Sequence, residues 1–332
     1  MQNNNAVNKE VPVNCISCIT TGHCRARIIF NCTVHIYVKQ MTEKPAVPPN
    51  LALFASIVAV STASILIRMS NAGPLAIAAY RLILSTLMLL PFYLQGNRLG
   101  SFLKSSRRDK ATLAAVGVVL ALHFASWITS LEHTSVASSV IFVHVDPIFV
   151  AVVSHFYLGE RVGRNTATGM AVAFLGSIII AWGDAGAGES NLYGDLLALG
   201  GAIMLGLYIM AGRRLRQKLD LVSYVTPVYA ASALTLTLLG VATGSNMGPF
   251  PVREYLLFAV IALVPMIFGH TVYNWTLKYI SAAVVSISLL GEPVGATILA
   301  FIFLGENPSA TTLIGGAITM AGIYLCVRSG EG

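Results

Sequence analysis

Long apolar runs separated by short polar segments fill the chain from Leu51 onward. A run of about 20 apolar residues is long enough to cross a hydrocarbon core of ~30 Å as a helix. The runs are continuous and lack the alternation of barrel strands, so helices are favoured. We therefore predict an all-α polytopic membrane protein with ten transmembrane helices, at 51–70, 74–95, 111–131, 134–158, 166–183, 194–212, 221–241, 255–276, 279–303 and 309–328.

Composition agrees with this pattern and excludes other classes of protein. Of 332 residues, 55% are hydrophobic and only 11% are charged, whereas soluble domains carry about 25% charged residues. The chain is therefore not a soluble enzyme, a secreted disulfide scaffold, a disordered protein or a nucleic-acid binder. The net charge of +7 then reflects basic loops on one side of a membrane.

The positions of lysine and arginine predict the orientation of the helices. Thirteen basic residues fall in loops on one side of the predicted bundle, while Arg253 lies in a loop on the other side. Positive loops face the cytoplasm, so we expect both termini to be cytoplasmic and the protein to lie in a bacterial inner membrane. The thirteen are Arg98, Lys104, Arg107, Arg108, Lys110, Arg161, Arg164, Arg213, Arg214, Arg216, Lys218, Lys278 and Arg328.

Residues 1–50 differ from the rest of the chain because they are polar and hold four of the five cysteines. Cys15 and Cys18 have the spacing of a zinc knuckle, but Cys24 and Cys32 do not supply a second one. We expect a disordered tail, or sequence upstream of a true start at Met41, and predict no metal site.

The chain contains an internal repeat. Sliding it by 146 residues aligns 135–180 with 281–326, with eleven identities in 46 positions. Asp146-Pro147 matches Glu292-Pro293, and the Leu-Gly-Glu triplet 158–160 matches 304–306.

This repeat predicts two halves of five helices each, 51–183 and 194–328. The offset equals five helices, an odd number, so the halves must have inverted orientations in the membrane. Inverted repeats are typical of secondary transporters, which bind substrate near the midplane between the halves.

These residues resemble a known group. The repeated carboxylate-proline pair, the Leu-Gly-Glu triplets, Tyr80-Arg81 and the segment 291–295 are similar to the drug/metabolite transporter superfamily, EamA type. The resemblance covers about 51–328 and implies transport of a small molecule, mostly by export. It implies little about the substrate, because the family spans amino acids, nucleotides, sugars and drugs. Asp146 is a departure, since this family often has a neutral residue before the first proline.

Three charged residues lie deep in the predicted helices. Asp146 and Glu292 are at the midpoints of 134–158 and 279–303, and Arg81 is seven residues into 74–95. Charges at this depth are expensive and are functional candidates, so we expect them to bind substrate or to form an ion pair. Pro147 and Pro293 each remove a helical hydrogen bond, which favours a kink.

Two aromatic clusters with histidine extend this set of candidates. His123 and Trp127 share one helix face, as do His270 and Asn274 with Tyr273 beside them. Their helices are repeat partners, so the clusters are expected to line opposite walls of one cavity. His144 lies ~160° around the helix from Asp146, so both cannot face the same cavity unless Pro147 distorts the turn.

The sequence therefore favours a secondary transporter that exports small metabolites such as amino acids, amines or drug-like compounds by alternating access. Protons are a candidate coupling ion through Asp146 or Glu292. The expected partners are the substrate and the lipid bilayer, without cofactor or nucleic acid, and the protein is a monomer or a homodimer. A membrane-embedded enzyme with a midplane metal or carboxylate site, and a non-transporting sensor, are the alternatives. No phosphate-binding loop or hydrolase motif is present, so we do not expect an enzyme.

Overall fold

The computed structural model describes residues 45, 47–133, 139, 142–153, 156, 163–184, 192–304 and 310–329. The chain divides into two units, Met1–Pro48 and Pro49–Gly332, and all helices described below belong to the second. The cysteines of the tail, the Leu-Gly-Glu triplet 158–160, Ser135 and Glu306 lie outside the described residues.

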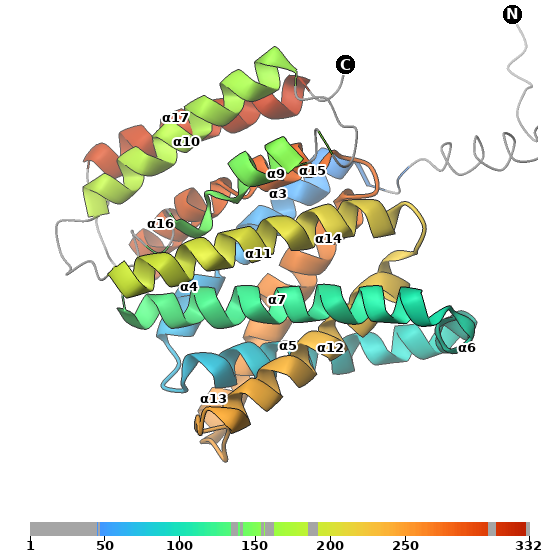
Figure 1. The fold of residues 1–332 in the computed structure, drawn as a ribbon. Coiled ribbons are helices and arrows are strands. Elements are labelled where there is room, and N and C mark those ends of the chain that lie inside the picture. Colours follow the sequence, from blue (N-terminus) through green and yellow to red (C-terminus); the bar gives the residue numbers. More distant parts are fainter. Residues whose placement is uncertain are drawn as a thin grey trace, which may run out of the picture. The chain divides into compact units, whose positions relative to one another are not determined.

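The described residues are helical in both halves of the second unit, as predicted (Figure 1). The elements of the first half are α3 (Pro49–Val60), α4 (Ala63–Arg68), α5 (Pro74–Leu94), η1 (Gln95–Asn97), α6 (Arg98–Lys104), α7 (Arg107–His133), α9 (Asp146–Val153) and α10 (Arg164–Asp184). Those of the second half are α11 (Leu192–Arg216), α12 (Leu221–Ala242), α13 (Val252–Ile261), the π-helix η4 (Ala262–Thr271), α14 (Val272–Thr276), α15 (Ala282–Ser288), α16 (Gly291–Leu304) and α17 (Ala310–Ser329).

Six helical stretches in the described part of the chain are long and apolar enough to cross a membrane. They confirm that the chain is a multi-pass membrane protein. They are Pro49–Arg68, Pro74–Lys104, Arg107–His133, Leu192–Arg216, Leu221–Ala242 and Val252–Thr276. Because the predicted span 134–158 is only partly described, and residues 305–309 lie outside the described part of the chain, the count of ten helices stays a prediction.

Local sequence explains several helix boundaries. Pro74 occupies the first turn of α5, where its missing N–H costs no hydrogen bond. Asp220 caps α12 by accepting a hydrogen bond from the backbone N–H of Ser223, and Ser281 caps α15 in the same way. Pro265 lies inside η4, where the removed hydrogen bond accompanies the wider π-helical turn.

Both carboxylate-proline pairs stand at the start of a helix. α9 begins at Asp146, after a turn at residues 144–145, and α16 begins at Gly291, after a turn at 289–290. The chain is thus not one straight helix at either predicted midpoint. Each carboxylate lies in the first turn of its helix, where the helix dipole favours negative charge.

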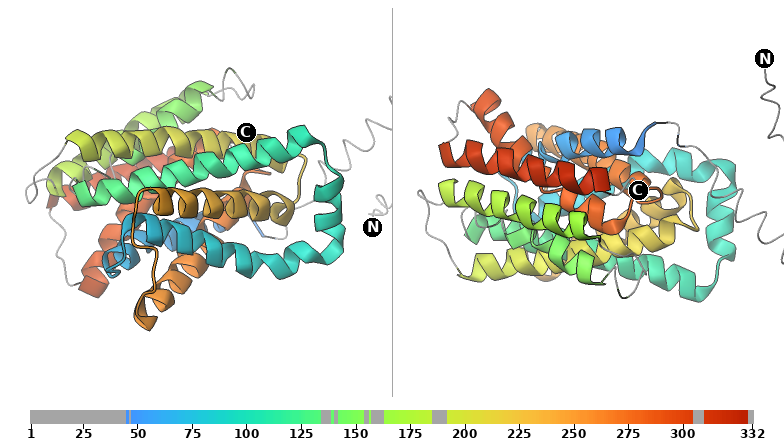
Figure 2. Two further views of the ribbon diagram at one scale, coloured as in Figure 1. Left: turned by 60° about the horizontal axis from the view of Figure 1, so that its bottom comes forward. Right: turned by 90° about the horizontal axis from the view of Figure 1, so that it is seen from above.

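The helices pack in pairs that join the two halves. α10 lies along α17, α7 packs between α11 and α12, and α5 packs against α12 and η4 (Figures 1 and 2). The shorter helices α9 and α15 also pack together. The core therefore forms between the halves rather than separately within each one.

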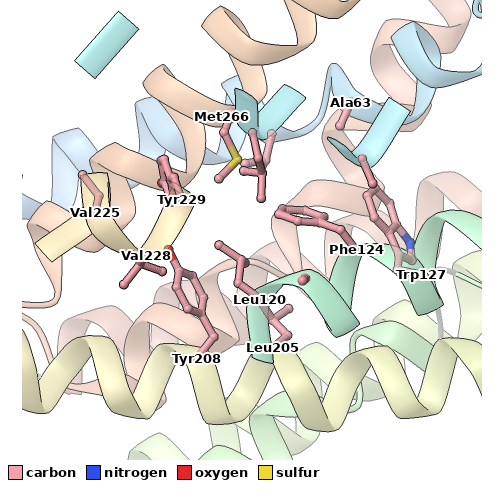
Figure 3. Packing of buried hydrophobic residues seen from close by; sticks show 14 of the residues in the cluster. Ala63, Leu120, Phe124, Trp127, Leu205, Tyr208, Val225, Val228, Tyr229 and Met266 are labelled. Carbon is pink, nitrogen blue, oxygen red and sulfur yellow. The ribbon is translucent and has the colours of Figure 1, made fainter. Parts of the chain in front are cut away.

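Buried side chains from both halves fill the centre of this bundle, as Figure 3 shows for Phe124, Leu205, Tyr229 and Met266. The outward faces remain apolar, and side chains such as Leu234, Leu238 and Phe301 are at least half exposed. An apolar exterior of this kind suits contact with lipid rather than with water.

Candidate functional site

Arg81 is the most deeply buried charge among the described residues, with a fully buried side chain on α5. Its guanidinium carbon lies 4.1 Å from the centre of the Phe124 ring on α7. Nη2 donates to the sulfur of Met266 on η4 over 3.6 Å, and Figure 3 shows Phe124 and Met266 reaching toward the same space. Nε and Nη1 have no hydrogen-bond partner among the described residues. The cation is therefore held by an aromatic face and a weak acceptor, and two of its nitrogens are free to bind a ligand.

Glu292 supplies a negative charge to the same region from the first turn of α16. Its Oε2 lies 3.8 Å from Nε2 of His144, and the Glu292 side chain is 19% exposed. Ser61, between α3 and α4, donates to the backbone carbonyl of Glu292 over 3.3 Å. The start of α16 is thereby tied to the first half of the chain.

A cavity brings these groups together. Its volume is about 30 Å³, enough for about two water molecules. Both halves contribute to its wall, which consists of Val60, Ala63, Arg81, His123, Trp127, Val143, His144, Leu205, His270, Tyr273, Leu289 and Glu292. Six of the eight predicted substrate-binding residues thus line one cavity.

The two histidine clusters, around His123 and His270, form parts of the cavity wall, and each histidine makes a hydrogen bond. Nδ1 of His123 lies 2.9 Å from the carbonyl oxygen of Gly201. Because a carbonyl only accepts, this nitrogen carries the proton. The His123 ring is parallel to Trp127, with 6.2 Å between ring centres. Nδ1 of His270 lies 2.6 Å from the Tyr273 hydroxyl.

Asn274 and Asp146, the other two predicted residues, lie outside the cavity wall. Asn274 is buried, and its amide nitrogen donates to the Tyr208 hydroxyl over 2.9 Å and to the His270 carbonyl over 2.6 Å. Asp146 is also buried, and Ser286 of α15 donates to its Oδ2. Its other oxygen, Oδ1, has no partner among the described residues. Asp146 thus joins α9 to α15. His144 lies in the turn that precedes α9 and lines the cavity.

Two hydrogen-bonded clusters lie away from the cavity. Glu254, in the first turn of α13, is buried and accepts from the Ser70 hydroxyl over 2.5 Å and from the Asn71 N–H over 3.2 Å. Nη1 of Arg253 lies 3.4 Å from Oε1 of Glu254, and Nη2 of Arg253 donates to the Met69 carbonyl over 2.9 Å. This cluster ties the turn between α4 and α5 to α13.

The second cluster surrounds Asp220 at the start of α12. Its carboxylate accepts from Ser223 and from Arg98, whose Nε lies 3.1 Å from Oδ1. Burial by itself raises the pKa of Asp220, but the hydrogen bonds from Ser223 and the charge of Arg98 outweigh it. The pKa of this carboxyl is therefore below its ordinary value.

Sequence reasoning missed three residues of the site. Phe124 and Met266 contact the Arg81 guanidinium, and Ser286 binds Asp146. Apolar residues in apolar helices carry no distinguishing pattern, and the contact of Ser286 joins it to a residue 140 positions away in the sequence. The part of the chain that the structure describes contains no group of three or more His, Cys, Asp or Glu residues that could hold a metal ion.

Comparison with known proteins identifies the chain's relatives. The model of the EamA-like transporter family matches residues 49–182 and 192–328. An uncharacterized transporter of Archaeoglobus fulgidus is 25% identical over 277 residues, which cover 83% of this chain and 95% of the relative. The pseudopaline exporter CntI of Pseudomonas aeruginosa is 25% identical over 68% of this chain and 78% of its own length.

Two further proteins extend this comparison. A probable terminal-alkyne amino-acid exporter of Streptantibioticus cattleyicolor is 27% identical over 59% of this chain and 65% of its own length. A protein of known crystal structure aligns with a TM-score of 0.71 at 19% identity, over 85% of this chain and 97% of that one. The last match shows a shared fold.

Proposed function

Because the chain belongs to the EamA-like transporter family, we propose that it is a secondary transporter that exports small metabolites from the bacterial cytoplasm by alternating access. The observation that carries this proposal is the cavity whose wall combines Arg81, Glu292 and three histidines from both halves of the chain. A site built between two repeats can open to one side and then to the other as the halves rock.

The pattern of helix packing supports two repeated halves. α7 packs on α11 as η4 packs on α3, and α7 packs on α12 as η4 packs on α5. α9 packs on α11 as α16 packs on α3. Two further pairs, α5 with α12 and α10 with α17, join elements that correspond in the repeat. Each of these contacts between a helix of one half and a helix of the other thus has an equivalent contact in which the halves are interchanged, as a pseudo-two-fold axis requires. Because the offset between the repeats is an odd number of helices, the repeats are inverted. Both termini are then cytoplasmic.

The relatives support export and suggest the chemical class of cargo. One is named as an exporter of an amino acid and another as an exporter of pseudopaline. Amino acids, amines and drug-like compounds are the substrates we propose to screen first. The membrane-enzyme and sensor alternatives have no comparable support, because the relatives are named as transporters and exporters.

Proton coupling is part of the proposal. Glu292 has access to the cavity and a histidine partner within 3.8 Å, and Asp146 retains one oxygen without a partner among the described residues. Carboxylates at this depth are the usual carriers of protons in membrane transporters. The two carboxylates lie in the first turns of α9 and α16, which correspond in the repeat, so a proton bound at either one changes the charge at equivalent points of the two halves.

Resistance profiling followed by flux measurement tests this function. Cells that overexpress the full chain are screened against toxic analogues of amino acids and amines. Compounds that are tolerated are then loaded into proteoliposomes with and without a pH gradient. We expect gradient-stimulated flux that Glu292→Gln abolishes and that Glu132→Gln, at an exposed position, leaves unchanged.

The outcomes separate the parts of this proposal. Flux that ignores the pH gradient removes proton coupling and leaves transport in place. Absence of flux for every tolerated compound, with correctly folded protein, contradicts the transport function itself.

A further inference from the structure

We propose that the cavity recognises a zwitterion, with the substrate carboxylate bound by Arg81 and the substrate ammonium bound by Glu292. This inference rests on the proposed transport function for its biological meaning, and it assigns a substrate class and a binding direction within that site.

The incomplete pairing of Arg81 points to an anionic ligand. Its side chain is fully buried, and Nε and Nη1 have no hydrogen-bond partner among the described residues. A buried charge without an ionic partner is unfavourable. The Phe124 face and the Met266 sulfur offset only part of that loss. An anion that binds at the cavity wall satisfies the unpaired N–H groups.

The position of Glu292 favours a ligand whose carboxylate has an ammonium group beside it. Glu292 and Arg81 line the same cavity of about 30 Å³, so opposite charges face a space of small dimensions. A phosphate or a dicarboxylate would bring excess negative charge against Glu292, and a simple amine would leave Arg81 unsatisfied. A zwitterion presents one charge to each and adds no net charge to a site of low dielectric.

The rest of the wall defines what the zwitterion carries. Val60, Leu205, Leu289 and Trp127 are apolar or aromatic, so the side chain of the substrate is expected to be apolar or aromatic. A cavity of about 30 Å³ is too small for a complete amino acid. A complete amino acid therefore binds in a more open arrangement of the two halves, with the same two contacts.

Matched ligand series test the proposal without any mutation. Alanine, leucine and phenylalanine are each compared with the amine that lacks the carboxylate and the acid that lacks the ammonium. Binding to the full chain in nanodiscs is measured by thermal stabilisation and by titration calorimetry. We expect at least one amino acid to bind at least about tenfold more tightly than both of its analogues, because a site built for a polar group rejects ligands that lack it.

Variants assign the two contacts. Arg81→Met should remove the preference for the amino acid over its amine, and Arg81→Lys, which retains the charge, should keep part of it. Glu292→Gln should instead remove the preference for the amino acid over its acid. Arg68→Met, at an exposed arginine on α4, is the control and should change neither preference.

Three outcomes overturn the inference. These are no binding in any series, an amine that binds as well as its amino acid, or an unchanged preference in both Arg81 variants. Binding with the expected preferences but without flux in proteoliposomes would instead uphold the inference and contradict the proposed transport function.

Discussion

At the scale of single residues, the cation–π contact between Arg81 and Phe124 stabilises a charge inside the bundle. A buried cation over an aromatic ring is stabilised by about 2 kcal/mol when both are desolvated. Phe124→Leu should therefore lower the free energy of unfolding by about 2 kcal/mol, including the smaller packing volume. Reversible unfolding in mixed micelles measures the loss.

A double-mutant cycle separates the charge contact from packing. With Arg81→Met in the background, Phe124→Leu should cost about 1–2 kcal/mol less than in the native chain. Phe92→Leu, at an exposed position on α5, is the control for the loss of a ring. An additive cycle would show that Phe124 acts only by filling space.

The residue scale also shows what the sequence could and could not predict. Arg81 and Glu292 were identifiable because charges inside apolar runs are rare, but the run boundaries put Glu292 at a helix midpoint, whereas it lies in the first turn of α16. Helix geometry predicted that His144 and Asp146 would not both face the cavity, but it did not predict the turn at 144–145 that precedes α9. Phe124 was not identifiable, because nothing in an apolar helix distinguishes the one ring that meets a cation. The Asp146–Ser286 contact joins residues 140 positions apart, and no local pattern encodes it.

At the scale of elements, α12 depends on its cap. Asp220→Ala removes the acceptor for Ser223 and should destabilise the protein by about 1 kcal/mol at neutral pH, whereas Asp220→Asn retains an acceptor and should cost less. The folded-state pKa of Asp220 lies below its ordinary value, so this stabilisation is complete above about pH 5 and is lost as the pH falls through the folded pKa.

Unfolding measured between pH 3 and pH 8 checks this dependence. The difference between the native chain and Asp220→Ala should be constant above about pH 5 and shrink at lower pH. A difference that grows on acidification would contradict the assigned direction of the pKa.

The pair α10 and α17 depends on glycine at its contact. A Cβ atom at Gly176 would lie 2.4 Å from the backbone nitrogen of Thr319 and 2.6 Å from the carbonyl oxygen of Gly315. Neither atom can move without the helix, so Gly176→Ala should separate the helices and destabilise the protein by about 1–3 kcal/mol.

The matched control is Gly200→Ala on α11, where no atom lies within 4 Å of the added Cβ. That substitution should be neutral or should stabilise the helix by up to about 1 kcal/mol. Equal effects of the two substitutions would show that α10 and α17 are not held in close contact. The sequence did not indicate which helix would pack against α10. The π-helix η4 was also not predicted. A proline in an apolar run indicates that the helix is distorted there, but not whether it kinks or widens into a π-helix.

At the scale of the whole molecule, we expect the cluster around Glu254 to hold the predicted outer side of the cavity closed. Its carboxylate joins the second half to the turn at Ser70 and Asn71 in the first half. If the halves rock, these bonds must break when the cavity opens toward the predicted outer side. Hydrogen bonds to a charged group are worth about 1.5–3 kcal/mol, so Glu254→Ala should raise the population of the outward-open state by about tenfold or more.

Labelling at a single cysteine measures that shift. Phe250→Cys, placed in the aromatic cluster with Tyr80 and Phe258, is introduced after the native cysteines are replaced by alanine. A membrane-impermeant maleimide applied from outside should react about tenfold faster when Glu254 is alanine. Glu132→Gln should leave the rate unchanged. An unchanged rate with Glu254→Ala would mean that this cluster anchors α13 in every state, and that the outer opening lies between other elements of the two halves.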